Sequence, residues 1–363
     1  MGPVRNRARG TGRRRRLRRP VGAVGVALMA ALLNPAAASA DAAGAAGRTC
    51  RDVTIPATSG LLNASIHGVL CTPAGPAKDT VQVLLHGGTY NSSYWDFPVA
   101  EGRYSYARQA NNSGYTTLAI DRLGSGTSTR PLSALVTIDS QADIVHQVVG
   151  RLKAGEVTGA PVTRVALVGH SMGTGVASVE TTTYGDVDAV VLTGGTAQLD
   201  TGALLTMLTS QVWPAALDPA FGPLIDPLYL TTKPGVRAAA FHAGGDVDPE
   251  VVRHDEATKD VASPVELTGT VLKGFSAATT RKITVPTMVQ VGSNDQLFCA
   301  PGNAADCATP QALASAQATA FGPAARLHTS VLPGAGHDLQ LDRNGADAAR
   351  EVTHWLDATL PSR

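Results

Sequence analysis

The chain has 363 residues, of which 44% are hydrophobic and only 16% are charged. This composition excludes a disordered or fibrous protein and fits one large globular domain. Residues 1–40 contain nine Arg and no acidic residue; subtracting these nine from the 30 basic residues leaves 21 against 29 acidic ones. The remaining net charge of about −8 argues against nucleic acid as a partner.

The amino terminus has the three parts of a secretory signal peptide. A basic region over residues 1–20 is followed by the apolar run 21–33 and by the small residues 38–40. The apolar run ends at Asn34, short of the ~20 residues that a transmembrane helix needs. We therefore expect cleavage before Asp41 and a secreted, extracellular protein without a stable membrane anchor. The paired arginines are compatible with the general or the twin-arginine export route.

Export makes the cysteines informative, because disulfides persist in an oxidising compartment. Two β-rich runs, residues 53–56 and 64–70, flank a Ser59-Gly60 turn, so a hairpin would bring Cys50 and Cys71 together. Cys299 and Cys307 close a short loop rich in Pro, Gly and Asn. Of the three possible pairing schemes we predict the one that joins Cys50 to Cys71 and Cys299 to Cys307, with free buried thiols as the alternative. No Cys-x-x-Cys or clustered His suggests a metal site.

Short apolar runs then alternate with helical patterns. The predicted strands are residues 81–85, 116–120, 164–168, 189–193, 287–291 and 327–332. They lack clean alternation, which is typical of strands buried on both faces. Helical spacing is seen over residues 144–152 and 346–360. The alternation predicts an α/β fold with a mostly parallel central sheet and helices on both faces.

The segment from about 197 to 282 is longer than a crossover between two strands needs. We interpret it as an inserted, mainly helical cap over the sheet. Five of its apolar residues at helical spacing are expected either to line a pocket or to pack between cap and sheet: Leu204, Leu205, Leu208, Val212 and Trp213.

The sequence Gly169-His170-Ser171-Met172-Gly173 matches G-x-S-x-G between a strand and a small-residue helix. In that setting the serine lies on a tight strand-to-helix turn, and the glycines avoid clashes with the neighbouring backbone. Ser171 is therefore the candidate nucleophile.

A serine hydroxyl needs a base, and the base needs an acid that orients it. His337 lies in a Gly-rich turn after the last strand and is the candidate base, whereas the other histidines considered (His242, His254, His328 and His354) are expected to be surface or core residues. Asp295, after the strand 287–291, is the candidate acid, with Asp200 as its rival. Asp338 is expected to be a solvated neighbour of His337.

The order Ser171, Asp295, His337 is that of the α/β-hydrolase superfamily, which residues 80–360 resemble. His86-Gly87-Gly88 is similar to the family's oxyanion loop, and residues 121–126 resemble its D-x-x-G-x-G turn. The resemblance implies an α/β-hydrolase fold.

The resemblance also implies roles for residues around the nucleophile. Backbone N–H groups of Gly88 and Met172 would stabilise the oxyanion. Thr89 is the alternative to Gly88, because the loop is longer than usual. His86 would hold this loop by hydrogen bonding, and Asp121 and Arg122 would stabilise loops near the site.

Dehalogenases and epoxide hydrolases of this superfamily carry an aspartate at the nucleophile position, so Ser171 indicates a hydrolase of acyl compounds. We expect a secreted serine esterase or lipase that cleaves small-molecule or lipid esters through an acyl-enzyme, without cofactor or metal. The alternatives are an exopeptidase, whose amine-binding acids would come from Glu250, Asp255 and Glu256, and a non-catalytic binding protein. The Cys299–Cys307 bond is expected to rigidify the loop of Asp295.

Overall fold

The structure, a computed structural model, describes residues 48–242, 244–299 and 305–362. The predicted signal peptide and its cleavage site lie outside these residues. Among the described residues, no helix combines the length and the apolar character that crossing a membrane requires.

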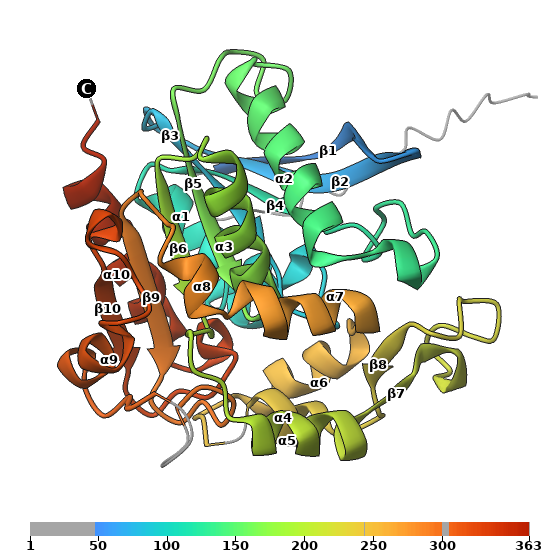
Figure 1. The fold of residues 1–363 in the computed structure, drawn as a ribbon. Helices are drawn as coiled ribbons and strands as arrows, with labels where there is room; N and C mark the ends of the chain where they lie inside the picture. Colours follow the sequence, from blue (N-terminus) through green and yellow to red (C-terminus); the bar gives the residue numbers. More distant parts are fainter. Residues whose placement is uncertain (1–47, 243, 300–304, 363) are drawn as a thin grey trace, which may run out of the picture. The chain divides into compact units, whose positions relative to one another are not determined.

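An eight-stranded sheet forms the centre of the described chain (Figure 1). Its order is β1-β2-β4-β3-β5-β6-β9-β10; β1, β2 and β4 pair antiparallel, and all other neighbours are parallel. The strands are β1 (Arg48–Ser59), β2 (Leu62–Pro73), β3 (Thr80–Leu85), β4 (Thr116–Ile120), β5 (Arg164–His170), β6 (Ala189–Thr193), β9 (Thr287–Gly292) and β10 (His328–Leu332). The predicted mostly parallel sheet is confirmed, and all six predicted strands are present.

Helices cover both faces of the sheet (Figure 1). One side carries α2 (Ile138–Lys153), α3 (Met172–Tyr184) and α9 (Pro310–Gln317), and the other carries α1 (Tyr106–Asn112) and α10 (Gly345–Thr359). Successive residues of a strand pack into the hydrophobic cores on opposite faces of the sheet: Val83 packs on the α2 side and Leu84 on the α10 side. Both positions must therefore be apolar, which explains why the strand sequences do not alternate.

The hairpin of β1 and β2 places Cys50 directly opposite Cys71. The two sulfurs are bonded, as are those of Cys299 and Cys307, so the structure has the predicted pairing. Gly60 has φ +57° in the turn, a conformation that glycine adopts without steric cost.

The chain between β6 and β9 forms the cap, which is mainly helical. Its helices are α4 (Thr201–Thr206), α5 (Arg237–Phe241), α6 (Pro249–Ala257), α7 (Pro264–Gly269) and α8 (Ala277–Thr280), and π-helical turns extend α4 and α7. Four of the five begin at an Asp or Ser whose side chain accepts from the first-turn backbone, as at Asp248 and Ser263. The cap also contains an antiparallel pair, β7 (Val212–Pro214) and β8 (Leu230–Thr232), that the sequence pattern did not predict.

Candidate active site

Ser171 occupies the turn between β5 and α3. Its backbone has φ 52° and ψ −118°, a strained conformation that is held by the packing around it. A Cβ at Gly173 would overlap the carbonyl oxygen of Leu85, and one at Gly169 would overlap the carbonyl of Gly173. Both glycines of the motif are therefore needed for the strand and the helix to approach this closely.

The structure brings Ser171, His337 and Asp295 together from three separate loops. The Ser171 Oγ lies 2.9 Å from Nε2 of His337, and Nδ1 of His337 lies 2.9 Å from Oδ2 of Asp295. These distances allow Ser171 to donate to Nε2 while Nδ1–H donates to the carboxylate. The three residues thus form one continuous series of hydrogen bonds, from Ser171 through His337 to Asp295.

Asp295 is fixed in place by its own loop. Its Oδ1 accepts from the backbone N–H of Leu297 (2.9 Å) and of Phe298 (3.3 Å), which leaves Oδ2 for His337. The rival acid, Asp200, instead accepts from two N–H groups of α4 and caps that helix. Of the two candidates, only Asp295 is hydrogen-bonded to His337.

His337 is buried, and the ring centroids of Phe298 and Phe241 lie 5.8 and 6.0 Å from that of its imidazole. Burial alone would lower the pKa of His337, but the charge and hydrogen bond of Asp295 raise it above the ordinary value. The ring is therefore suited to accept a proton and to hold it as an imidazolium.

The loop Gly87-Gly88-Thr89 lies against the nucleophile turn. A Cβ at Gly87 would come 3.2 Å from the Cβ of Ser171, and one at Gly88 would overlap the sulfur of Met172. Met172 is the first residue of α3, so its N–H has no acceptor within the helix. Gly88, Thr89, Ser171 and Met172 all line one pocket, which is the arrangement that backbone oxyanion donors need.

The residues expected to brace this loop do so. His86 contacts the Gly87 carbonyl oxygen through Nδ1 (2.8 Å) and the Ser125 hydroxyl through Nε2 (2.9 Å), and burial lowers its pKa to about 3, so its ring is neutral. Arg122 donates to the carbonyl oxygens of His86 and Gly87.

The turn after β4 is held by Asp121, which accepts from the backbone N–H of Ser92 (2.8 Å) and Thr127 (2.9 Å). Arg122 pairs in addition with the buried Glu266 of the cap. No sequence motif marks Glu266, so its pairing with Arg122 was not predicted.

The expectation that Asp338 is solvated was wrong. Asp338 is fully buried and accepts from His170 Nε2 (2.9 Å) and from the hydroxyl of Tyr90. Burial alone would raise its pKa, but the hydrogen bond from His170 and the nearby histidines hold it below the usual range. The partners of Asp338 are 168 and 248 residues away along the chain, so local sequence gave no sign of them.

A buried ion pair of the cap also reaches the oxyanion loop. Arg237 and Asp255 are both fully buried and form two hydrogen bonds, of 2.9 and 2.8 Å. Arg237 also donates to the hydroxyl (3.0 Å) and the carbonyl oxygen (3.3 Å) of Thr89, whose φ is +60°. Asp255 further contacts His242 Nε2 (3.0 Å). The cap thereby holds the oxyanion loop with Thr89 in its left-handed conformation. No sequence motif around Arg237 predicts this role.

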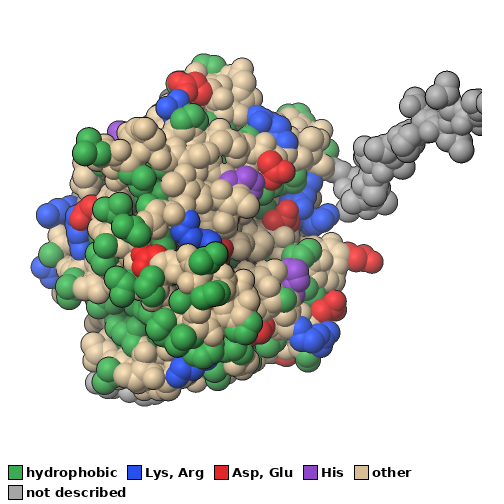
Figure 2. Space-filling view, turned by 90° about the vertical axis from the view of Figure 1, so that its right-hand side faces the viewer, with side chains coloured by type: hydrophobic (Ala, Val, Ile, Leu, Met, Phe, Trp, Pro, Cys, Tyr) green, Lys and Arg blue, Asp and Glu red, His purple; other side chains and the backbone are tan. Residues whose placement is uncertain are grey.

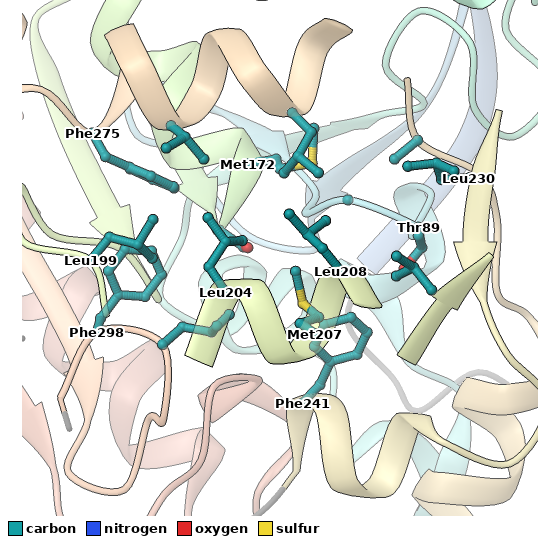
Figure 3. A pocket seen from close by; sticks show the side chains of 17 residues that line it. Thr89, Met172, Leu199, Leu204, Met207, Leu208, Leu230, Phe241, Phe275 and Phe298 are labelled. Atoms are coloured by element: carbon teal, nitrogen blue, oxygen red, sulfur yellow. The ribbon is translucent and has the colours of Figure 1, made fainter. Parts of the chain in front are cut away.

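The pocket above Ser171 is lined almost wholly by apolar side chains. Within the part of the chain that the structure describes, Thr89 and Ser171 are the polar side chains that line it. Figure 3 shows Leu204, Met207 and Leu208 pointing into it from one helix, with Phe275 and Phe298 at one side and Thr89 and Leu230 at the other.

Of the five cap residues considered for a pocket, Leu204, Leu208 and Val212 line it. Leu205 is 62% exposed, so the expectation was wrong for this residue; Trp213 is half-buried and does not line the pocket.

Two groups of His and Asp side chains near the site have atoms close enough to share a cation. They are His170, His337 and Asp338, and His242, Asp255 and Asp338. In both groups the carboxylates accept from the histidines, from Tyr90 or from Arg237, and His337 is engaged by Ser171 and Asp295. Among the described residues, Nδ1 of His242 has no hydrogen-bond partner, whereas Nε2 of this ring and the three carboxylates and rings named above are engaged with one another.

The sequence profile described as the alpha/beta hydrolase family matches residues 82–351. The chain belongs to the α/β-hydrolase family. The match spans β3 to α10 and so includes the nucleophile turn, the acid, the histidine and the cap. The protein is accordingly a hydrolase by family. No curated protein sequence matches the chain significantly.

Solved structures of similar fold include three hydrolases. A thermophilic esterase from Thermogutta terrifontis superposes with a TM-score of 0.59 at 17% identity, covering 85% of this chain and 99% of its own. A bacterial membrane phospholipase A superposes with a TM-score of 0.56 at 16% sequence identity, covering 86% of this chain and 87% of its own. A peroxisomal α/β-hydrolase from Saccharomyces cerevisiae superposes with a TM-score of 0.54 at 14% sequence identity, covering 88% of this chain and 91% of its own. At these identities the likeness concerns the fold.

Proposed function

We propose that this α/β-hydrolase is a secreted serine hydrolase that cleaves carboxylic esters through an acyl-enzyme on Ser171. The observation that carries the proposal is the line Ser171–His337–Asp295, with two distances of 2.9 Å, at the floor of an apolar pocket. A nucleophile, a base and an orienting acid in this geometry are what acyl transfer requires.

In the proposed reaction, Ser171 Oγ attacks the ester carbonyl carbon while its proton passes to Nε2 of His337. The carbonyl oxygen becomes an oxyanion facing the N–H groups of Gly88 and Met172. When the tetrahedral intermediate collapses, the C–O bond to the alcohol breaks and His337 gives the alcohol its proton. Water, deprotonated by His337, then attacks the acyl-enzyme, and the acid leaves as the proton returns to Ser171.

The pocket favours an ester over a peptide with a free amino terminus. An exopeptidase needs an acidic group beside the substrate amine, but none of the described residues that line the pocket is acidic. Asp255 is engaged by Arg237, Glu256 pairs with Lys259 (3.0 Å), and Glu250 is exposed at the start of α6. Esterase and phospholipase activities among proteins of similar fold agree with the ester assignment.

The proposal of secretion rests on the amino-terminal sequence and on the cysteines. The basic, apolar and small-residue order predicts export, and all four cysteines are within disulfide bonds, which an oxidising compartment preserves.

The test is hydrolysis of p-nitrophenyl esters from acetate to palmitate, with Ser171→Ala as the control. We expect ester hydrolysis that the substitution abolishes, and the optimal acyl length will separate a small-ester carboxylesterase from a lipase. Folded protein that is inactive on every ester but cleaves aminoacyl-p-nitroanilides would contradict the proposal and favour an exopeptidase.

A further inference from the structure

The connection between β7 and β8 presents an apolar surface to solvent. Between Pro214 and Leu228 the exposed residues are four prolines, three leucines and one alanine, and none is polar. Leu217, Leu224 and Leu228 are 63, 99 and 60% exposed. Single exposed leucines are ordinary on a protein surface, whereas a continuous apolar surface marks an interaction site. We call this segment the 214–228 surface.

The two acidic residues of this segment, one buried and one partly exposed, anchor it. Asp218 is buried and forms an ion pair with Lys259 (2.8 Å). Asp226 accepts from the backbone N–H of Ser133 (2.6 Å), and the hydroxyl of Tyr229 donates to the Pro131 carbonyl oxygen (2.9 Å). The base of the segment is thus fixed to the loop before α2, and none of the exposed residues of the segment is charged.

The apolar surface continues toward the pocket. Val212 and Leu230, two residues beyond the two ends of the segment, line the pocket. The neighbouring helix α4 lines it too and exposes Leu205, and no charged residue occurs from Thr201 to Leu217. Figure 2 shows hydrophobic side chains gathered on the lower part of one face of the molecule, with few charges among them.

We propose that the 214–228 surface docks on a lipid aggregate of zwitterionic or uncharged headgroups, from which an acyl chain enters the pocket above Ser171. This inference rests on the proposed ester hydrolysis. The pocket accepts an apolar group, and esters with long apolar groups gather into aggregates in water. Proline has no N–H, so four of the exposed residues bring no backbone donor that an apolar phase would leave unpaired.

The test is co-sedimentation of purified Ser171→Ala protein with phosphatidylcholine vesicles, which this variant does not hydrolyse. We expect binding that changes little between about 0.1 and 1 M salt, because the surface is uncharged. Leu224→Ser/Leu228→Ser in the same background should weaken binding about tenfold or more, because it removes two apolar side chains from the contact. Leu61→Ser, a 104% exposed leucine in the turn between β1 and β2, is the matched control and should bind unchanged.

Activity gives a second readout in protein that retains Ser171. Leu224→Ser/Leu228→Ser should hydrolyse dissolved p-nitrophenyl acetate as fast as the wild type, but an emulsified long-chain ester several-fold more slowly. Neither leucine lines the pocket, so this split reports on docking.

Three results would overturn the inference: no binding to vesicles, equal binding by the double variant, or a dimer in light scattering that the double variant dissociates. The last would make a second copy of the chain the partner. Vesicle binding by Ser171→Ala without ester hydrolysis by the wild type would instead contradict the proposed function while supporting lipid docking.

Discussion

The protonation of His337 controls the proposed reaction, because only the neutral ring can accept the proton of Ser171. Burial alone would lower the pKa of His337, but the carboxylate of Asp295 raises it above the ~6.5 of an unperturbed histidine side chain. Activity should therefore be lost as the pH falls through a midpoint above ~6.5. The pH dependence of kcat/KM on a p-nitrophenyl ester measures this midpoint, and a midpoint below 6 would contradict the account.

Asp295→Asn removes the charge that orients and stabilises His337. By comparison with other triads, kcat should fall about 10⁴-fold while the fold persists. Asp200→Asn is the matched control: this aspartate caps α4, and its substitution should leave kcat nearly unchanged. Comparable losses in both variants would show that the acid is misassigned.

The turn between β5 and α3 depends on glycine at Gly173, since a Cβ there would overlap the backbone of Leu85. Gly173→Ala should lower the free energy of unfolding by several kcal/mol or prevent folding. Gly150→Ala is the control, because Gly150 lies within α2 with open space around it and alanine there should stabilise the helix by about 0.5–1 kcal/mol. Thermal unfolding measures both, and an unaffected Gly173→Ala would disprove the packing argument.

The cap and the oxyanion loop are joined through Arg237. Arg237→Gln leaves the fully buried Asp255 without its ion pair, which should cost about 3–5 kcal/mol of stability. The substitution also removes the hydrogen bonds from Arg237 to Thr89 of the oxyanion loop. The fold decrease in kcat should therefore exceed the fold increase in KM. The control Arg343→Gln disrupts an exposed pair with Asp246 and should cost under ~1 kcal/mol. Denaturant unfolding and ester kinetics test this coupling. Equal losses of stability and of kcat in the two variants would refute it.

For the whole molecule, the two disulfides have different expected consequences. The backbone N–H of Cys299 donates to the carbonyl oxygen of Asp295 (2.8 Å), so the Cys299–Cys307 bond braces the loop of the acid. Removing it with Cys299→Ser/Cys307→Ser should cost about 2–3 kcal/mol and lower kcat several-fold. Cys50→Ser/Cys71→Ser should cost about 3 kcal/mol with kcat unchanged, since β1 and β2 contribute nothing to the pocket. Unchanged stability and activity after mild reduction would contradict the bracing role.

Much of this molecule was readable from its sequence, because the informative features are local. The buried strands are continuous apolar runs, and Ser171, Asp295 and His337 each follow a strand in an expected order. Three features could not be predicted from the sequence: the burial of Asp338, the Arg237–Asp255 pair and the role of Glu266. Each depends on partners from distant segments that only the cap and the folded sheet bring together.

The central claim is that Ser171 is the nucleophile of an acyl-transfer site. The most direct test is intact-mass analysis of folded protein treated with a fluorophosphonate, followed by peptide mapping. The account predicts one covalent adduct per chain, located on Ser171 and absent from Ser171→Ala. An adduct on another residue, or no adduct on correctly folded protein, would contradict it; the second result would favour a non-catalytic binding protein.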